Sequence, residues 1–321
     1  MKRGLVIGKF MPLHLGHIAL IRFAAAQCDE LIVSLSYTLH DPIDFNLRFF
    51  WIRQVLSDQP HIKPEILLDD FDNESLSLSH RAKIWAAIIK MRFPSIDLLF
   101  SSEEYGESFA ARLGVPSIVF DMQRGYVPVS ASVIRENPFR YWDFIPEIVR
   151  PYFVKKVCFY GPESTGKSVL AMHMAEVYQT EYVPEVAREM ITSNNFSVGD
   201  IVRIGHAQTQ RILEKTKTAN KILFCDTDLI TTQIYSQHYL HQVPEVLQEL
   251  EHQVKYDKYF LFDIDFPWVA DGLRDLGNQR EKMYALFKRE LVKREIPYIE
   301  VQGNVEHREQ IVRREVDQLI Q

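Results

Sequence analysis

A glycine- and lysine-containing loop in the second half of the chain has the residue types and spacing of a phosphate-binding loop. Residues 161–168 read Gly-Pro-Glu-Ser-Thr-Gly-Lys-Ser and follow the apolar run 157–160. In the pattern G-x-x-x-x-G-K-[ST], backbone N–H groups surround the phosphates at a helix N-terminus, the lysine reaches the β- and γ-phosphates, and the last hydroxyl holds Mg²⁺. The pattern predicts binding of a nucleoside triphosphate with Mg²⁺, and phosphoryl transfer. The candidate triphosphate-binding residues are Gly161, Glu163, Ser164, Thr165, Gly166, Lys167 and Ser168.

Carboxylates follow an apolar strand farther along the chain, where residues 222–225 lead into Asp226 and Asp228. A carboxylate at a strand end can hold Mg²⁺ or accept a proton from a substrate. We therefore take Asp226 as a candidate catalytic residue and metal ligand, and Asp228 as a candidate substrate-binding residue. The alternative for both is capping of the next helix. Glu185 and Arg188 follow another strand, and either contact an acceptor sugar or form an ordinary i, i+3 ion pair.

The segment 268–280 has the composition of a lid. Gly272 and Gly277 supply flexibility, while Arg274 and Arg280 carry charges that could close over phosphates. The alternative is a solvated, charged loop.

A second dense group of polar residues lies near the N-terminus, directly after the apolar run 5–7. Residues 8–17 read Gly-Lys-Phe-Met-Pro-Leu-His-Leu-Gly-His, with two histidines three positions apart. Imidazole N–H groups at a helix start can bind an α-phosphate or stabilise the charge that develops on phosphorus. A metal site is disfavoured because no third ligand lies at suitable spacing. The candidate residues here are Gly8, Lys9 and Phe10 for binding, and His14 and His17 for catalysis.

Two hydroxyls and an arginine follow later in the same half, at Ser130, Ser132 and Arg135. Alone, this segment is equally well explained by a serine N-cap with a surface arginine. Together with the histidine loop it predicts a second phosphate clamp, with Arg135 as a candidate catalytic residue.

Short apolar runs alternate with helix-length amphipathic segments, as in parallel-sheet α/β domains. We expect two such domains, residues 1–150 and 151–321, joined by a packed aromatic hinge at 135–152. A final helix is expected after an N-cap at Asn304, with Val305, Val312, Val316 and Leu319 on its buried face. The strands are expected at 3–7, 31–35, 65–68, 97–100, 117–120, 156–160, 181–183, 221–225, 258–262 and 297–301.

The composition is that of a globular enzyme, with 46% hydrophobic and 25% charged residues among 321. A net charge of −6 argues against a large nucleic-acid surface. The three cysteines are spaced far apart, which favours free thiols in a reducing compartment. With no signal peptide or membrane span expected, we predict a cytoplasmic protein.

The motif G-x-F-x-P-x-H-x-G-H with a later S-x-[ST]-x-x-R resembles the nucleotidylyltransferase superfamily, which uses a Rossmann-like sheet. The two halves and the hinge, in order, resemble the bifunctional NadR-type family, in which nicotinamide mononucleotide (NMN) adenylyltransferase is fused to ribosylnicotinamide kinase. Further segments that carry this resemblance are 101–106, 138–142, 226–233 and 268–277.

The resemblance implies NAD salvage in two steps. The P-loop kinase half would phosphorylate nicotinamide riboside (NR) from ATP with Mg²⁺, with Asp226 as base or metal ligand and Trp268 stacking on nicotinamide. The Rossmann-like half would then join NMN to ATP, giving NAD and pyrophosphate. His14, His17, Ser132, Arg135 and Arg48 would surround the phosphates there.

The resemblance has two departures. The first strand begins at residue 3, so we expect no N-terminal helix-turn-helix and no repressor role. Ser-Ala-Ser at 130–132 replaces the usual Ser-Gly-Thr, and the methyl of Ala131 crowds a close backbone approach. The alternatives are a kinase with a weakened adenylyltransferase half, and a nucleotide-binding sensor of vitamin uptake. A homo-oligomer and a functional link to an NR transporter stay open.

Overall fold

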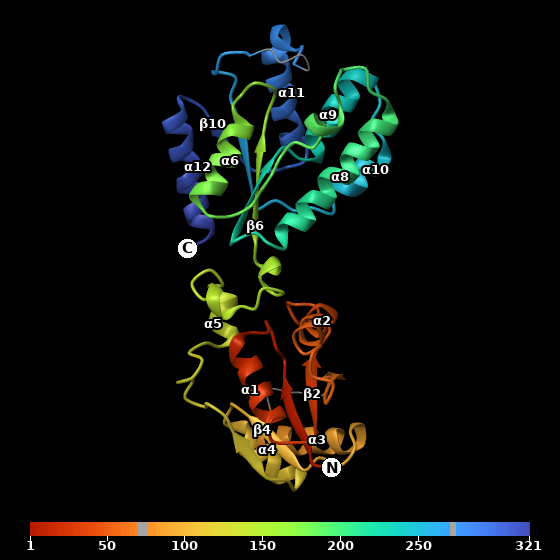
Figure 1. Cartoon of the computed structure of the whole chain (residues 1–321), viewed down its shortest axis with the longest axis vertical. Coiled ribbons are helices and arrows are strands. Elements are labelled where there is room, and N and C mark those ends of the chain that lie inside the picture. The colour runs from red at the N-terminus through yellow and green to blue at the C-terminus, as the bar shows by residue number, and fades with distance from the viewer. Residues whose placement is uncertain (70–75, 270–273) are drawn as a thin grey trace. The chain divides into compact units, whose positions relative to one another are not determined.

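The chain forms two compact units, Met1–Arg150 and Pro151–Gln321, each described by itself. The computed structural model (Figure 1) describes residues 1–69, 76–269 and 274–321. Each unit has its own parallel sheet and its own buried core.

The first unit has a parallel sheet with the strand order β3-β2-β1-β4-β5. Its strands are β1 Arg3–Gly8, β2 Glu30–Tyr37, β3 Ile62–Leu68, β4 Leu98–Ser101 and β5 Ser117–Val119. Its helices are α1 Leu15–Ala25, α2 Phe45–Val55, α3 Leu78–Arg92, α4 Tyr105–Leu113 and α5 Ala131–Glu136, with a 3₁₀ turn at Trp142–Phe144. β1 is buried on both faces, as expected for a parallel strand covered by helices on each side.

The order of the strands determines where a ligand can bind in this unit. The chain runs outward from β1 to β2 and β3 on one side, and to β4 and β5 on the other. The loops after β1 and β4 therefore diverge and leave a crevice at the carboxyl ends of these strands. The histidine loop follows β1 directly, which puts it at this crevice.

The second unit has a parallel sheet with the strand order β10-β9-β6-β8-β7. Its strands are β6 Lys155–Tyr160, β7 Tyr182–Val183, β8 Ile222–Asp226, β9 Lys258–Phe262 and β10 Tyr298–Val301. Its helices are α6 Lys167–Val177, α7 Ala187–Met190, α8 Val198–Thr216, α9 Leu229–Leu240, α10 Glu245–Glu251, α11 Arg280–Lys293 and α12 Val305–Leu319. A 3₁₀ turn lies at Gly277–Gln279 in this unit, and another, Arg150–Tyr152, spans the boundary between the two units along the chain.

Both faces of this sheet are buried. Val157 and Phe159 of β6 pack with α6 and α12, while Cys158 and Tyr160 pack with α9 and α11 on the opposite face. Figure 1 shows α6 and α12 on one side of the sheet and α9 on the other.

The predicted α/β fold is confirmed, and each predicted strand is present within three residues of its expected ends. Asn304 caps α12 through its side chain, as predicted. Val305 does not face the core, because 52% of it is exposed at the first turn, whereas Val312 and Val316 are fully buried. The aromatic hinge is packed as expected, with Trp142 buried beneath the Arg150 guanidinium.

All three cysteines are free. Cys158 and Cys225 are fully buried and are register partners on neighbouring strands β6 and β8. Burial raises the pKa of both thiols well above the usual range. Cys28, in the first unit, is partly exposed.

Within the described residues, none of the helices combines the length and apolar character that a membrane crossing requires.

Candidate functional site

The predicted phosphate loop connects the end of β6 to the start of α6. Gly161 has a φ of 134°, and a Cβ atom there would lie 2.9 Å from the carbonyl oxygen of Phe262. Gly166, at the N-cap of α6, has a φ of 85°. Both positions favour glycine, because other residues are strained at these angles. The loop thus ends at a helix N-terminus, which attracts phosphate.

Lys167 lies inside the loop, with 8% of its surface exposed. Its Nζ donates to the carbonyl oxygen of Pro162 at 2.6 Å and lies 3.4 Å from Thr165 Oγ1. Burial lowers the pKa of the ammonium, and the carboxylates of Asp226 and Glu185 oppose that shift. The ammonium group of Lys167 therefore lies where a phosphate bound in the loop would contact it.

A cavity of about 80 Å³ lies over the phosphate loop. Its walls include the predicted residues Gly161, Glu163, Ser164, Thr165, Gly166, Lys167, Ser168 and Arg274. Arg274 donates to the carbonyl oxygen of Val269, and Arg280 to that of Phe266. Gly272 of the predicted lid lies outside the described residues.

Asp226 ends β8 beside this loop and is 1% exposed. Burial raises its pKa to about 6, helped by Glu185 and opposed by Lys167 and a hydrogen bond from Ser168. Its Oδ1 atom is buried without a hydrogen-bond partner. A carboxylate oxygen in need of a partner, next to a serine hydroxyl, fits Mg²⁺, which takes few protein oxygens and keeps several waters.

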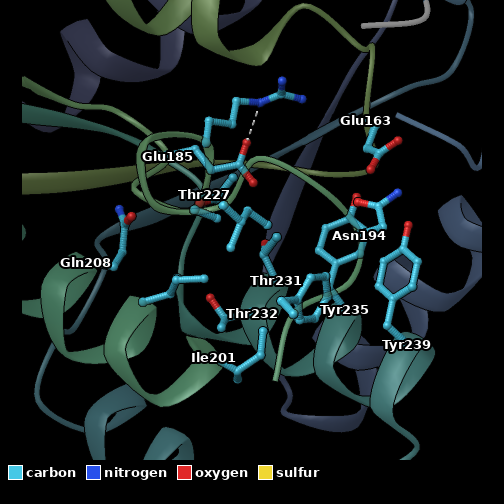
Figure 2. A pocket seen from close by; sticks show the side chains of 15 residues that line it. Glu163, Glu185, Asn194, Ile201, Gln208, Thr227, Thr231, Thr232, Tyr235 and Tyr239 are labelled. Atoms are coloured by element: carbon cyan, nitrogen blue, oxygen red, sulfur yellow. Dashed lines mark hydrogen bonds and ion pairs between the residues drawn. The ribbon is translucent and has the colours of Figure 1, made fainter. Parts of the chain in front are cut away.

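A second cavity, of about 70 Å³, adjoins the first; we call it the acceptor pocket. Figure 2 shows its polar side, with Glu163, Thr227, Tyr235 and Asn194 turned toward the space above Ile201. Its apolar lining is Ile191, Phe196, Ile201 and Ile204. The residues shared with the phosphate-loop cavity are Glu163, Glu185, Arg188, Thr227, Thr231 and Tyr235.

Glu185 and Arg188 line both cavities, as expected for residues that contact an acceptor. They also form the alternative ion pair, with Arg188 Nε 3.0 Å from Glu185 Oε2 (Figure 2). The two readings are compatible, because an ion pair at a cavity wall can still bind a ligand.

Asp228 differs from its prediction as a substrate-binding residue. Its side chain caps α9, with Oδ1 accepting from the backbone N–H and hydroxyl of Thr231, and Oδ2 accepting from the hydroxyl of Tyr259. The residue is 1% exposed and lines neither cavity. It is the helix cap that the sequence left as the alternative.

Trp268 also lies elsewhere than expected. Its indole packs against Gly277, with the Arg280 guanidinium 5.7 Å from the ring centre. Among the described residues, the lining of the acceptor pocket does not include Trp268, and its aromatic members are Phe196, Tyr235 and Tyr239. The neighbouring Val269 N–H donates to Ser164 Oγ at 2.9 Å, so this segment contacts the phosphate loop instead.

Arg308 of α12 supports the phosphate loop and was missed from the sequence. It is 2% exposed and donates to the carbonyl oxygens of Thr165 at 2.6 Å and Gly303 at 2.8 Å. It also pairs with Asp265 and lies 4.3 Å from the ring centre of Phe266. Its partner Thr165 is 143 positions away, so no local pattern could have indicated this contact.

In the first unit, the two histidines meet at the start of α1. His14 is the N-cap, and its Nδ1 accepts from the Gly16 N–H at 3.1 Å. The His17 ring stacks on it at 3.7 Å. Burial lowers the pKa of His14 to about 3 and that of His17 well below its usual value, and Arg124 adds to both shifts. Both rings are therefore neutral near pH 7, and because Nδ1 of His14 is an acceptor, its proton is on Nε2.

Arg135 reaches the histidine loop, where its Nη1 donates to the carbonyl oxygen of Met11, while Nη2 lies 3.4 Å from Ser132 Oγ. The structure thus brings the two predicted phosphate segments together. Ser130 is the N-cap of α5, and its hydroxyl accepts from the Val133 N–H. That contact matches the capping alternative for Ser130.

Arg48 differs from the expected phosphate contact. It is fully buried, donating to the Lys9 carbonyl oxygen and to Asp41, each at 2.6 Å. It supports the loop from inside instead of presenting its charge to a ligand. Phe10 is likewise buried, packed over Gly8 and edge-on to His17.

A cavity of about 230 Å³ lies at the crevice of the first sheet. Gly8 and Lys9 line it, as predicted. Tyr105, which lies in the segment 101–106 that carries the family resemblance, also lines it, as do Trp85 and Phe109, which the sequence did not single out. Tyr105 follows β4, and its hydroxyl lies 3.4 Å from the Ile7 carbonyl oxygen of β1. The position of Tyr105 just after the end of a strand was the sequence feature that could have indicated its place at the crevice.

Comparisons with known proteins agree with this architecture. Residues 156–308 match the family model of an AAA domain. The trifunctional NAD biosynthesis/regulator protein NadR of Escherichia coli (strain K12) is 33% identical over 329 residues, covering 93% of this chain and 78% of that protein.

Two solved structures have the same fold. A NadR protein in complex with NR has a TM-score of 0.83, 21% identity, and coverage of 99% of this chain and 96% of that chain. A NadR protein in complex with NAD and AMP-PNP has a TM-score of 0.81, 22% identity, and the same coverage. With one-third identity to the Escherichia coli protein over most of both chains, the chain belongs to the NadR family.

Proposed function

We propose that this chain makes NAD in two steps. The second unit phosphorylates NR from ATP, and the first unit then joins the resulting NMN to the adenylyl group of a second ATP. The family's NAD biosynthesis role and the NR, NAD and AMP-PNP complexes of NadR proteins support these substrates. The phosphate loop alone indicates only the triphosphate donor.

The observation that carries the kinase assignment is the wall shared by the two cavities of the second unit. A direct phosphoryl transfer requires the acceptor hydroxyl next to the γ-phosphate, in line with the bond that breaks. Glu185 and Thr227 line both cavities, so an acceptor in one would adjoin a triphosphate in the other.

In this mechanism the phosphate loop and Lys167 bind the triphosphate and balance its charge. Ser168 and Asp226 would hold Mg²⁺, which would supply charge neutralisation for the triphosphate. Asp226 ends β8 beside the phosphate loop and Glu185 lines both cavities, and the carboxylate of either residue is placed to take the proton of the attacking hydroxyl. The apolar lining of the acceptor pocket excludes water from the transfer.

In the first unit, the phosphate of NMN attacks the α-phosphorus of ATP directly and pyrophosphate leaves. The neutral His14 presents an Nε2–H donor to the developing charge, since its Nδ1 is held by Gly16. Arg135 lies at the same loop as a cation. This step needs positioning and charge stabilisation but no covalent enzyme intermediate.

The test is to incubate the purified protein with ATP, Mg²⁺ and NR and to follow products by chromatography. We expect NMN first and NAD second. Absence of NMN would refute the kinase assignment, and NMN that is never converted to NAD would refute the assignment of the first unit. Omitting Mg²⁺ and adding a chelator should abolish NMN formation.

A further inference from the structure

Glu163 is an unusual residue for its place in the phosphate loop. The loop collects N–H groups and the Lys167 ammonium, all of which favour an anion. A carboxylate in the same loop repels a triphosphate, so the pattern of the loop does not explain it. Its side chain must serve something other than the phosphates.

The geometry shows what this side chain lacks. Glu163 has no hydrogen bond or ion pair with any described residue, and its Oε2 atom is buried without a partner. A buried acceptor left unpaired costs about 1–3 kcal/mol. Figure 2 shows the side chain entering the acceptor pocket beside Asn194 and Tyr235, across the space from Gln208.

The charged and titratable groups around Glu163 come from several elements. Burial raises its pKa to about 7, reinforced by Asp275 and Glu185 and opposed by Arg188 and Lys167. Burial raises the pKa of Tyr235 and Tyr239 of α9, and the charge of Glu163 adds to both shifts. The side chain is thus partly buried without a salt bridge, and its buried oxygen Oε2 would be satisfied by a donor from a bound ligand.

The chemistry of the proposed acceptor, NR, indicates which of its groups could donate a hydrogen bond to Glu163. The pyridinium ring nitrogen of NR is positively charged but has no N–H, so it cannot satisfy a hydrogen-bond acceptor. The 5′-hydroxyl must face the γ-phosphate near Lys167 and Asp226. The remaining donors of NR are the 2′- and 3′-hydroxyls of the ribose and the N–H₂ of the carboxamide. Glu163 lines both cavities, so it lies at the end of the acceptor pocket where the ribose with its reacting 5′-hydroxyl would sit, whereas the carboxamide is at the far end of the molecule.

We propose that Glu163 belongs to the acceptor site and not to the ATP site: its buried carboxylate oxygen accepts a hydrogen bond from a secondary hydroxyl of the acceptor's ribose. The residue thereby selects ribosides over analogues that lack this hydroxyl. This assignment rests on the proposed kinase function, and it identifies a secondary ribose hydroxyl as the part of the substrate that Glu163 recognises.

The experiment compares NR with its 2′-deoxy and 3′-deoxy analogues in the wild type and in Glu163→Ala. A hydrogen bond to a charged group corresponds to about 10- to 100-fold. The wild type should therefore lose about that factor in kcat/KM on one of the two analogues. Glu163→Ala should use that analogue and NR equally, within about threefold, while its KM for ATP stays within about threefold of the wild type.

Glu189→Ala is the matched control, because its carboxylate is half-exposed on α7, pairs with Arg211, and lines neither cavity. It should discriminate between the analogues as the wild type does. Where Glu163→Ala fails to fold by thermal unfolding, Glu163→Gln keeps the size of the side chain, and it should discriminate at least threefold less than the wild type.

Three results would overturn the proposal: equal use of NR and both analogues by the wild type, full discrimination in the Glu163 variants, or a KM for ATP that rises as much as the KM for NR. All three are separable from failure of the kinase assignment. That assignment fails if the wild type makes no NMN from NR, whereas this proposal fails only when the wild type is active.

Discussion

Replacing Arg308 with methionine should destabilise the second unit and loosen the phosphate loop. The guanidinium donates to the carbonyl oxygens of Thr165 and Gly303 and pairs with Asp265, which is 37% exposed on its side chain. Methionine keeps the length and the apolar contact with Phe266 but provides no donor. The substitution therefore tests the polar contacts while largely retaining the packing.

The magnitude follows from the burial of these contacts. Each hydrogen bond from a charged donor is worth about 1.5–3 kcal/mol. The bond to Thr165 is buried and the bond to Gly303 is partly buried, and the two are not fully additive. Asp265 keeps contact with water, so its loss of a partner adds little. We expect the free energy of unfolding of the second unit to fall by about 3 kcal/mol, or its Tm by about 6–12 °C.

Arg313→Met is the matched control on the same helix. Arg313 is 45% exposed on its side chain and makes an i, i+4 ion pair with Glu309, worth about 0.5 kcal/mol or less. Hydrogen exchange read by mass spectrometry assigns the loss to peptides of the second unit, and kinase assays should show a raised KM for ATP in Arg308→Met alone. Equal stability of the two variants would refute the reasoning.

Three further outcomes are expected. Lys167→Ala should abolish NMN formation while NAD formation from supplied NMN continues; a folded variant that loses both activities, measured by chromatography, would contradict the division between the units. The pKa of histidine is about 6.5 in the unfolded chain, whereas that of folded His14 is about 3. Below pH 6.5 the unfolded chain therefore binds a proton that the folded protein does not, and the free energy of unfolding falls as the pH falls. Between pH 7.5 and 5.5 His14 alone removes about 1.4 kcal/mol from the first unit. Because the pKa of His17 is lowered as well, His14→Gln should reduce this slope in denaturant titrations without abolishing it. Asp228→Ala should destabilise the second unit by about 1–3 kcal/mol through loss of the cap of α9, with little change in the KM for NR; a large rise in that KM would restore Asp228 as a substrate ligand.

The fold was predictable because its signals are local. The central strands β1 and β6 are short apolar runs buried on both faces, and each of the two nucleotide motifs directly follows one of them. The phosphate loop and the histidine loop also follow from residue types at fixed spacing. Within each loop, the residues that adopt the special backbone angles lie only a few positions apart.

The side-chain roles were less predictable, because they depend on direction and on distant partners. Asp226 and Asp228 are two positions apart, yet the intervening Thr227 has a φ of 71°, and only Asp226 is turned toward the loop. Arg48 is a cation beside a phosphate motif, but its burial shows it to be a support. Arg308 lies on α12, far along the chain from the phosphate loop, and belongs to no motif. Only the folded structure therefore reveals its contact with the loop.

The buried thiols of Cys158 and Cys225 can report on local opening of the second unit. A thiol reagent attacks the thiolate, and both groups are fully buried with raised pKa values, so neither reacts while the sheet is closed. Their rate of alkylation therefore measures how often β6 and β8 become accessible, and Cys28 provides a separate signal from the first unit. Binding of ATP at the loop that extends from β6 stabilises the closed sheet, so saturating ATP should slow this labelling.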